Sequence, residues 1–164
     1  MHPDTMRLID RWAGIPLCFV TGLWSWIKSA LKTNSDNFTK QDSPELIVFI
    51  GLSEIGALVV AYPAIQEARE KYPNSRVCFI TSPVGLETLE LMGFERDEIL
   101  LMSTASLSGM FLNLISIRKK FSGKRVSAVV LEPFTRISAL ISVWIGATNR
   151  IGCYRFYNEG SYIG

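Results

Sequence analysis

From Glu45 onward, short apolar runs alternate with longer stretches of helical periodicity. Apolar runs of this kind are typical of strands buried on both faces, and their alternation with helices is typical of parallel sheets. The runs that we expect to form strands are 46–50, 76–81, 98–102, 125–131 and 150–154. The pattern therefore predicts a Rossmann-like α/β domain over residues 45–164, with a mainly parallel sheet and flanking helices on both faces.

Helices are expected between these strands. In the first of them, apolar side chains recur every three or four residues: Leu58, Ala61, Tyr62, Ile65, Ala68 and Tyr72. The other expected helices are 83–92, 105–121 and 134–146. Glycines stand where a helix end favours a left-handed residue: Gly93, Gly123 and Gly146. Pro63 either kinks the first helix or lies in its first turn, and the sequence leaves both open.

The first 44 residues follow another pattern. Residues 12–27 form an uncharged run of sixteen with tryptophans near its ends, shorter than the about 20 residues of a membrane span. We expect residues 1–32 to form an apolar helix, docked on protein or buried shallowly in a membrane interface. A secretory signal fits less well, because acids accompany the bases at its start and no small-x-small cleavage site follows. Residues 33–44 are polar and predict a linker.

Composition limits the partners and the reactive groups that this chain can use. The 164 residues suit one domain, and 17 basic against 15 acidic side chains give a net charge of +2, which does not favour nucleic acid as a partner. Cys18, Cys78 and Cys153 lie far apart, so we expect reduced thiols of a cytoplasmic protein and no metal site. His2 is the only histidine and lies at a terminus. Acid–base chemistry therefore falls to carboxylates.

The loop after the first strand is the first candidate site, because ligands of open parallel sheets bind at the carboxyl ends of the strands. Residues 51–57 read GLSEIGA, which matches neither a P-loop nor a dinucleotide fingerprint. Ser53 and Gly56 are candidate ligand-binding residues, because backbone N–H groups at a helix start suit an anion or a hydroxyl-rich group. Glu54 is a carboxylate in the same loop. Alternatively, this is a plain tight turn in which Ser53 or Glu54 only complements the helix.

The loop after the fourth strand is the second candidate site. If strands one and four are neighbours, Glu132 and Glu54 converge on one crevice, with Arg136 at its rim. Alternatively, Glu132 and Arg136 only form a pair one turn apart at a helix start. A separate basic run, residues 118–125, carries five bases and no acid. Such a run is either solvated surface or a contact for lipid phosphate or an anionic acceptor.

Two stretches resemble the family 9 glycosyltransferases, the heptosyltransferase family. Residues 47–83 resemble its opening unit, R-x-S-x-[LM]-G-D-x-[ILV]-x-x-x-P-A-[LIV]; the residues in register are Ser53, Gly56, Pro63, Ala64 and Ile65. Residues 129–153 resemble its D-[LF]-Q-x-x-x-[RK]-S-[AG]-L stretch and the R-[IV]-G that follows. Here the matching residues are Arg136, Ser138, Ala139, Leu140, Gly146, Arg150, Ile151 and Gly152. The resemblance covers about residues 45–155.

The resemblance implies the N-terminal, acceptor-side domain of a two-domain GT-B enzyme. Such enzymes transfer a sugar from a nucleotide-sugar of the ADP-heptose type to a lipopolysaccharide-type acceptor, without a metal or a further cofactor. The donor would bind a second domain, which this chain does not contain, so we expect a fragment or truncated product that transfers no sugar alone. The implied partners are a glycolipid or saccharide acceptor and, through residues 12–27, a membrane interface. The implied location is the cytoplasm, peripheral on the inner membrane.

The sequence departs from the family pattern where the chemistry takes place. Ala57 stands at the position of the family's aspartate, and Gly51 at that of its loop arginine. A methyl group cannot accept a proton, so either Glu54 takes the role of base or the catalytic function is altered or lost. The alternatives are a non-catalytic sugar- or lipid-binding module, and an unrelated Rossmann-like binding domain.

Overall fold

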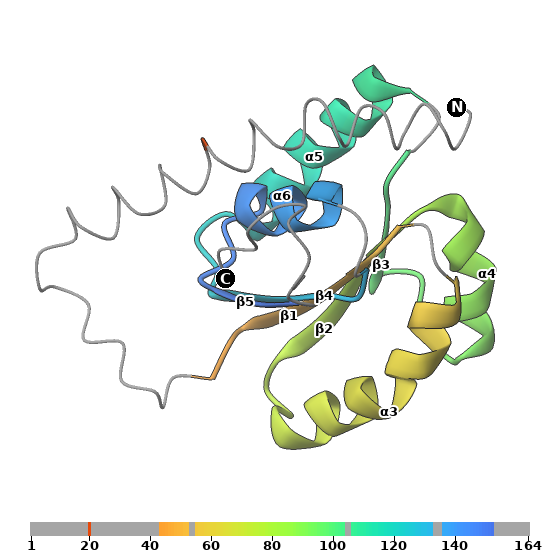
Figure 1. The fold of residues 1–164 in the computed structure, drawn as a ribbon. Helices are drawn as coiled ribbons and strands as arrows, with labels where there is room; N and C mark the ends of the chain where they lie inside the picture. The colour runs from red at the N-terminus through yellow and green to blue at the C-terminus, as the bar shows by residue number, and fades with distance from the viewer. Residues whose placement is uncertain (1–19, 21–42, 53–54, 104–105, 133–135, 153–164) are drawn as a thin grey trace, which may run out of the picture.

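The computed structural model describes residue 20 and residues 43–52, 55–103, 106–132 and 136–152. Five strands form one sheet in the order β3-β2-β1-β4-β5, and every neighbouring pair is parallel (Figure 1). The strands are β1 (Leu46–Gly51), β2 (Arg76–Thr81), β3 (Ile99–Leu101), β4 (Val126–Val130) and β5 (Asn149–Gly152). The connecting helices are α3 (Ile55–Lys71), α4 (Pro83–Leu91), α5 (Leu107–Phe121) and α6 (Arg136–Trp144). The predicted α/β fold is therefore confirmed.

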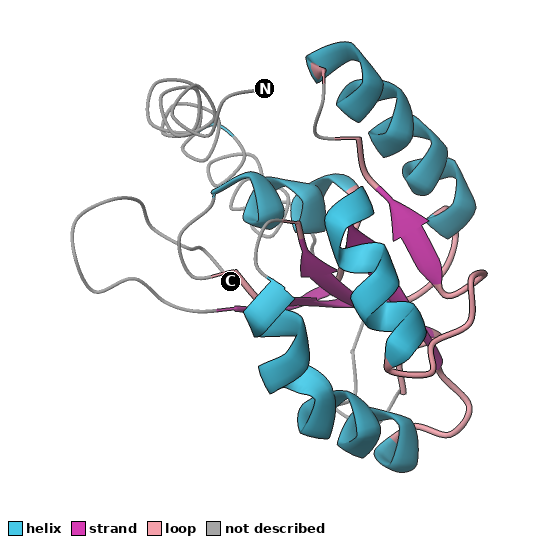
Figure 2. Cartoon of the chain, turned by 90° about the vertical axis from the view of Figure 1, so that its right-hand side faces the viewer, coloured by secondary structure: helices cyan, strands magenta, loops and turns pink. Residues whose placement is uncertain are grey.

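Helices cover both faces of the sheet because successive strand residues point to opposite sides. In β1, Val48 and Ile50 belong to one core cluster, together with Ile117 of α5. Phe49 belongs to the other cluster, together with Leu58 of α3. α3 and α4 thus pack on one face and α5 and α6 on the other, and Figure 2 shows the strands between these helical layers.

The central strands form the least accessible part of this core. All six residues of β1 are buried, which is the burial of a strand covered on both faces. Phe79 of β2 is fully buried and stacks on Phe49, with ring centroids 5.6 Å apart. Cys78 is also buried, and this burial raises the pKa of its thiol. The thiol is therefore protonated and shielded, as an inert core residue is.

The helix ends follow the sequence prediction. Gly93, Gly123 and Gly146 have φ of 81°, 77° and 78°, in the left-handed region that side chains with a Cβ avoid. Pro63 lies in the middle of α3 rather than in its first turn. Its ring is exposed, so the missing backbone hydrogen bond falls on the side of the helix that faces water.

Other boundaries differ from the prediction by one or two residues. β3 is three residues long, shorter than the apolar run that predicts it, because only Ile99–Leu101 pair with β2. β5 begins at Asn149, one residue early, where pairing with β4 starts. The predicted helix at 1–32 and most of the linker at 33–44 lie outside the described residues, apart from Val20 and residues 43 and 44. Within the described part of the chain, no helix has the length and apolar character to cross a bilayer.

Candidate functional site

The strand order places a switch point between β1 and β4. From β1 the chain winds outward through β2 and β3, and it then crosses back to add β4 on the other side of β1. The two strands are neighbours, which is the condition that the sequence analysis set for a shared site, and they pair from Leu46 opposite Val126 to Ile50 opposite Val130. Open α/β sheets bind ligands in the crevice outside the carboxyl ends of such strands. The loops that follow β1 and β4 therefore frame the candidate site.

Glu132 joins these two loops. Its side chain is 1% exposed, and its Oε1 accepts a hydrogen bond of 2.7 Å from the backbone N–H of Leu52, the residue after β1. Its Oε2 accepts a hydrogen bond from the hydroxyl of Ser138 in α6. Both carboxyl oxygens are thus engaged by the protein itself. Glu132 is buried at the carboxyl ends of β1 and β4, where it links the residue that follows β1 to α6.

Arg136 lies deeper than the rim position that the sequence predicts. It is the first residue of α6 and is only 9% exposed. A cation at a helix N-terminus meets the positive end of the helix dipole, and the first turn of α6 contains no acid to offset it. Such an arrangement is unfavourable for the isolated helix by about 0.3–1 kcal/mol. A buried arginine in this place is therefore held by its surroundings rather than by helix preference.

The β1 loop is described only at its two ends. Ser53 and Glu54 lie outside the described residues, so their predicted convergence with Glu132 stays a prediction. Gly56 lies in the first turn of α3, is exposed, and would have no atom within 4 Å of an added Cβ. Among the described residues, no contact requires a glycine there. The hydrogen bond between Leu52 and Glu132 nevertheless places Leu52 beside the switch point, and Leu52 lies two residues before Glu54.

A small pocket, which the sequence analysis missed, lies on the other side of β1. It has an empty volume of about 150 Å³, is open to solvent, and is lined by the ends of β1 and β2 and the starts of α3 and α4. Thr81 and Ser82 contribute buried polar side chains to it. Thr81 Oγ1 has no hydrogen-bond partner among the described residues. The signal in the sequence is the pair of polar residues that directly follows the apolar run of the second strand.

Gly85 closes one wall of this pocket, so its replacement tests the geometry. A Cβ at this position would collide with Thr81 Oγ1 and approach Leu58 Cδ1 to 3.1 Å. We expect Gly85→Ala to lower the free energy of unfolding by about 1–3 kcal/mol, as overpacking of a filled core does. Urea unfolding followed by circular dichroism measures this change.

Gly56 provides the matched control, because it also lies in the first turn of a helix but faces open space. Gly56→Ala should leave stability unchanged or raise it by up to about 1 kcal/mol, since alanine is the better helix former. Equal effects of the two substitutions would show that the close packing around Gly85 is wrong.

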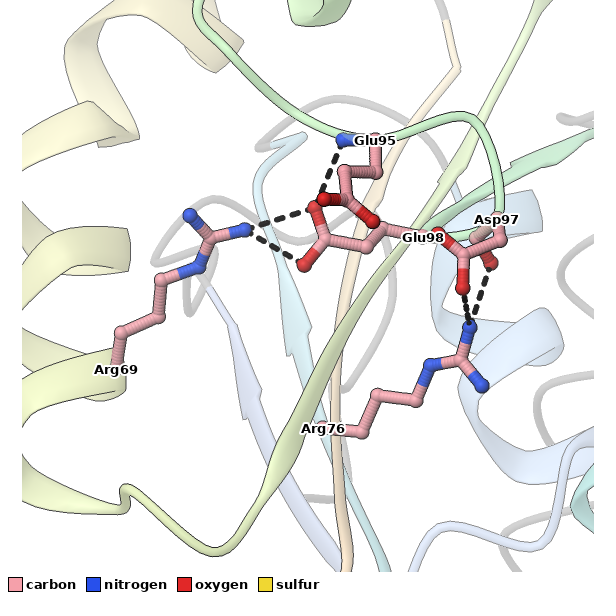
Figure 3. Close-up of polar contacts among 5 residues, drawn as sticks. All are labelled: Arg69, Arg76, Glu95, Asp97 and Glu98. Atoms are coloured by element: carbon pink, nitrogen blue, oxygen red, sulfur yellow. Dashed lines mark hydrogen bonds and ion pairs between the residues drawn. The ribbon is translucent and has the colours of Figure 1, made fainter.

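A second group of charged side chains lies at the opposite, amino-terminal edge of the sheet (Figure 3). Arg69 Nη2 donates hydrogen bonds of 2.7 and 2.8 Å to the two carboxylate oxygens of Glu98. Arg76 pairs with Asp97, and the backbone N–H of Glu95 donates to Glu98. These bonds connect α3, β2 and the loop before β3. Because the charges pair with one another and lie far from the carboxyl ends of the strands, their role is structural.

The candidate site thus comprises Glu132, Arg136 and Ser138, which the structure brings together at the switch point, and the predicted residues Ser53 and Glu54, which lie outside the described residues. The described residues contain no group of three or more His, Cys, Asp or Glu side chains that could hold a metal ion. No model of a protein family, no curated protein and no solved structure matches this chain.

Proposed function

We propose that this chain is the acceptor-side domain of a glycosyltransferase similar to the heptosyltransferases. It would present a lipopolysaccharide-type saccharide to a nucleotide-sugar of the ADP-heptose type, held by a second domain. The observation that carries the proposal is the buried group Glu132, Arg136 and Ser138 at the switch point. Arg136 and Ser138 are also residues through which the sequence resembles that family. Their burial at the carboxyl edge of the sheet, where open α/β sheets bind ligands, supports a shared role.

In the proposed reaction, the acceptor hydroxyl oxygen attacks the anomeric carbon as the bond to the nucleotide diphosphate breaks. Glu54 takes the hydroxyl proton, since Ala57 cannot. Arg136 binds a carboxylate or phosphate of the acceptor, for which its planar guanidinium is suited. Glu132 keeps the β1 loop in place through Leu52. The transfer needs no metal, and the proposed location is the cytoplasmic face of the inner membrane, where such acceptors are assembled.

Binding of an acceptor to this chain tests the proposal without the donor domain. We expect Arg136→Gln to weaken the binding of a soluble, phosphorylated inner-core oligosaccharide by about 10- to 100-fold, the loss typical of a hydrogen bond to a charged group. Isothermal titration calorimetry measures the dissociation constant, and circular dichroism verifies that the variant is folded.

Arg96→Gln serves as the control, because Arg96 is exposed and pairs with Glu90 away from the switch point. This variant should bind the oligosaccharide as the unaltered chain does. If the unaltered chain does not bind the oligosaccharide, or if both variants bind it equally, the acceptor role is wrong.

A non-catalytic saccharide-binding module is the second candidate. The observation in its favour is Ala57, which stands where the family has its catalytic aspartate. Such a module would bind the oligosaccharide through Arg136 as well. It would nevertheless support no sugar transfer when joined to a donor-binding domain, which separates the two candidates.

A further inference from the structure

The outer side of α5 combines exposed apolar side chains with basic ones. Phe111 and Leu112 are 52% and 67% exposed, although both are large and apolar. The second half of the helix contributes the buried residues Ile117 and Phe121 to the core, whereas Met110 and Leu114 of the first half are only partly buried against it. In Figure 1 the first half of α5 lies farther from the sheet than the second half. Clustered apolar side chains in water indicate a contact surface.

Trp144 at the end of α6 extends this apolar area. It is 44% exposed, and its ring centroid lies 6.1 Å from that of Phe111. Its indole N–H donates a hydrogen bond of 3.2 Å to the carbonyl of Leu114. The polar atom of the ring is thus satisfied within the protein. Part of the ring stays exposed beside Phe111.

Basic side chains lie next to the apolar ones. Arg118 and Lys119 follow Phe111 and Leu112 by seven residues, which is two helical turns, so each pair shares one side of α5. Lys119, Lys120 and Lys124 are exposed and form no ion pair within the described residues. The helix and the turn after it, residues 107–125, contain no acid. The exposed surface of α5 is therefore both apolar and positively charged.

We propose that this α5 surface, formed by Phe111, Leu112, Trp144, Lys119, Lys120 and Lys124, binds an anionic lipid bilayer. Aromatic and leucine side chains enter the boundary between headgroups and acyl chains, and lysines beside them attract anionic lipids. The helix α4 on the opposite face of the sheet lacks this charge. There, Leu91 of α4 is 90% exposed, but α4 contains Glu87 and Glu90 and no base. Charge complementarity thus favours a bilayer at α5 and not at α4.

Vesicle binding by the full chain tests the proposal. The chain should sediment with vesicles of phosphatidylglycerol and phosphatidylcholine more strongly than with vesicles of phosphatidylcholine alone. Since one lysine near an anionic surface contributes a factor of about five, replacing Lys119, Lys120 and Lys124 by glutamine should weaken partitioning about a hundredfold. Phe111→Ser with Leu112→Ser should weaken it about tenfold or more.

Matched controls come from the opposite face. Val60→Ser with Leu91→Ser removes two apolar side chains of even greater exposure, 81% and 90%, and should leave partitioning unchanged. Lys71→Gln removes one exposed base from α3 and should have little effect. If the variants of α5 partition like the unaltered chain, membrane contact lies elsewhere, as residues 12–27 would provide, and the proposal is wrong.

A fluorescent label locates the contact directly. An environment-sensitive dye on Leu112→Cys, with Cys18 and Cys153 replaced by serine and Cys78 buried, should shift to the blue when anionic vesicles are added. The same dye on Leu91→Cys should not shift. A dye at position 112 that is already blue-shifted without vesicles, and does not respond to them, would show that another part of the chain or a second copy covers this surface. Such a dye at position 112, or a blue shift at position 91 when vesicles are added, would overturn the proposal.

Discussion

Replacing Glu132 by leucine is expected to lower the free energy of unfolding by about 2–6 kcal/mol. The substitution removes the acceptor for two buried donors, the N–H of Leu52 and the hydroxyl of Ser138. Each donor left without an acceptor in the interior costs about 1–3 kcal/mol. Urea unfolding measures the total loss. Hydrogen exchange of the Leu52 amide should become faster, and this rate reports the loss of the hydrogen bond at the β1 loop.

Glu132→Gln is the matched control because it keeps the shape of the side chain. Its amide oxygen can accept from Leu52, and its amide nitrogen can donate to Ser138 Oγ, since a hydroxyl both donates and accepts. We expect this variant to lose about 1 kcal/mol, far less than the leucine variant. If glutamine and leucine destabilise equally, the two hydrogen bonds of Glu132 do not hold the switch point together.

Glu54→Gln has the largest effect expected on activity. Under the proposed function, Glu54 takes the proton of the acceptor hydroxyl, and loss of a general base costs about 10²- to 10⁴-fold in rate. Turnover should therefore fall by at least about a hundredfold in a protein that joins this domain to a donor-binding domain. A coupled assay for release of the nucleoside diphosphate measures this turnover.

Glu67→Gln is the control for Glu54, because Glu67 is exposed on α3 and lies well after the β1 loop. It should keep full turnover. Near-full turnover of the Glu54 variant would mean that this residue only complements the start of α3, and that the base comes from another loop or domain.

The sequence by itself determines most of the fold. The alternation of apolar runs and helical stretches leaves few arrangements other than a parallel sheet with helices on both faces. Gly93, Gly123 and Gly146 mark helix ends because only glycine readily adopts their backbone angles. The apolar run at 98–102 predicts a strand longer than β3. The difference arises because the observed length is set by pairing with β2, which extends only over Ile99–Leu101.

The candidate site is predictable only in part. Glu132 and Arg136 are recognisable as polar residues after a buried strand, and the neighbourhood of β1 and β4 follows from the usual strand order. The burial of these two side chains is not recognisable from the sequence, because it depends on segments that are distant along the chain. Glu132 meets Leu52 across a separation of 80 residues. The sequence thus indicates which residues end the strands, whereas packing decides that Glu132 positions a loop instead of facing solvent.

The α5 surface shows the same division. Sequence alone finds the basic run at 118–125 and offers solvated surface or an anionic contact as its explanation. Only the tertiary structure brings Trp144 of α6 against Phe111 of α5, 33 positions apart in the chain. Local periodicity determines secondary structure because the chain must bury its apolar side chains. Which side chains share a surface depends on how the helices pack across the sheet, and one sequence window does not contain that information.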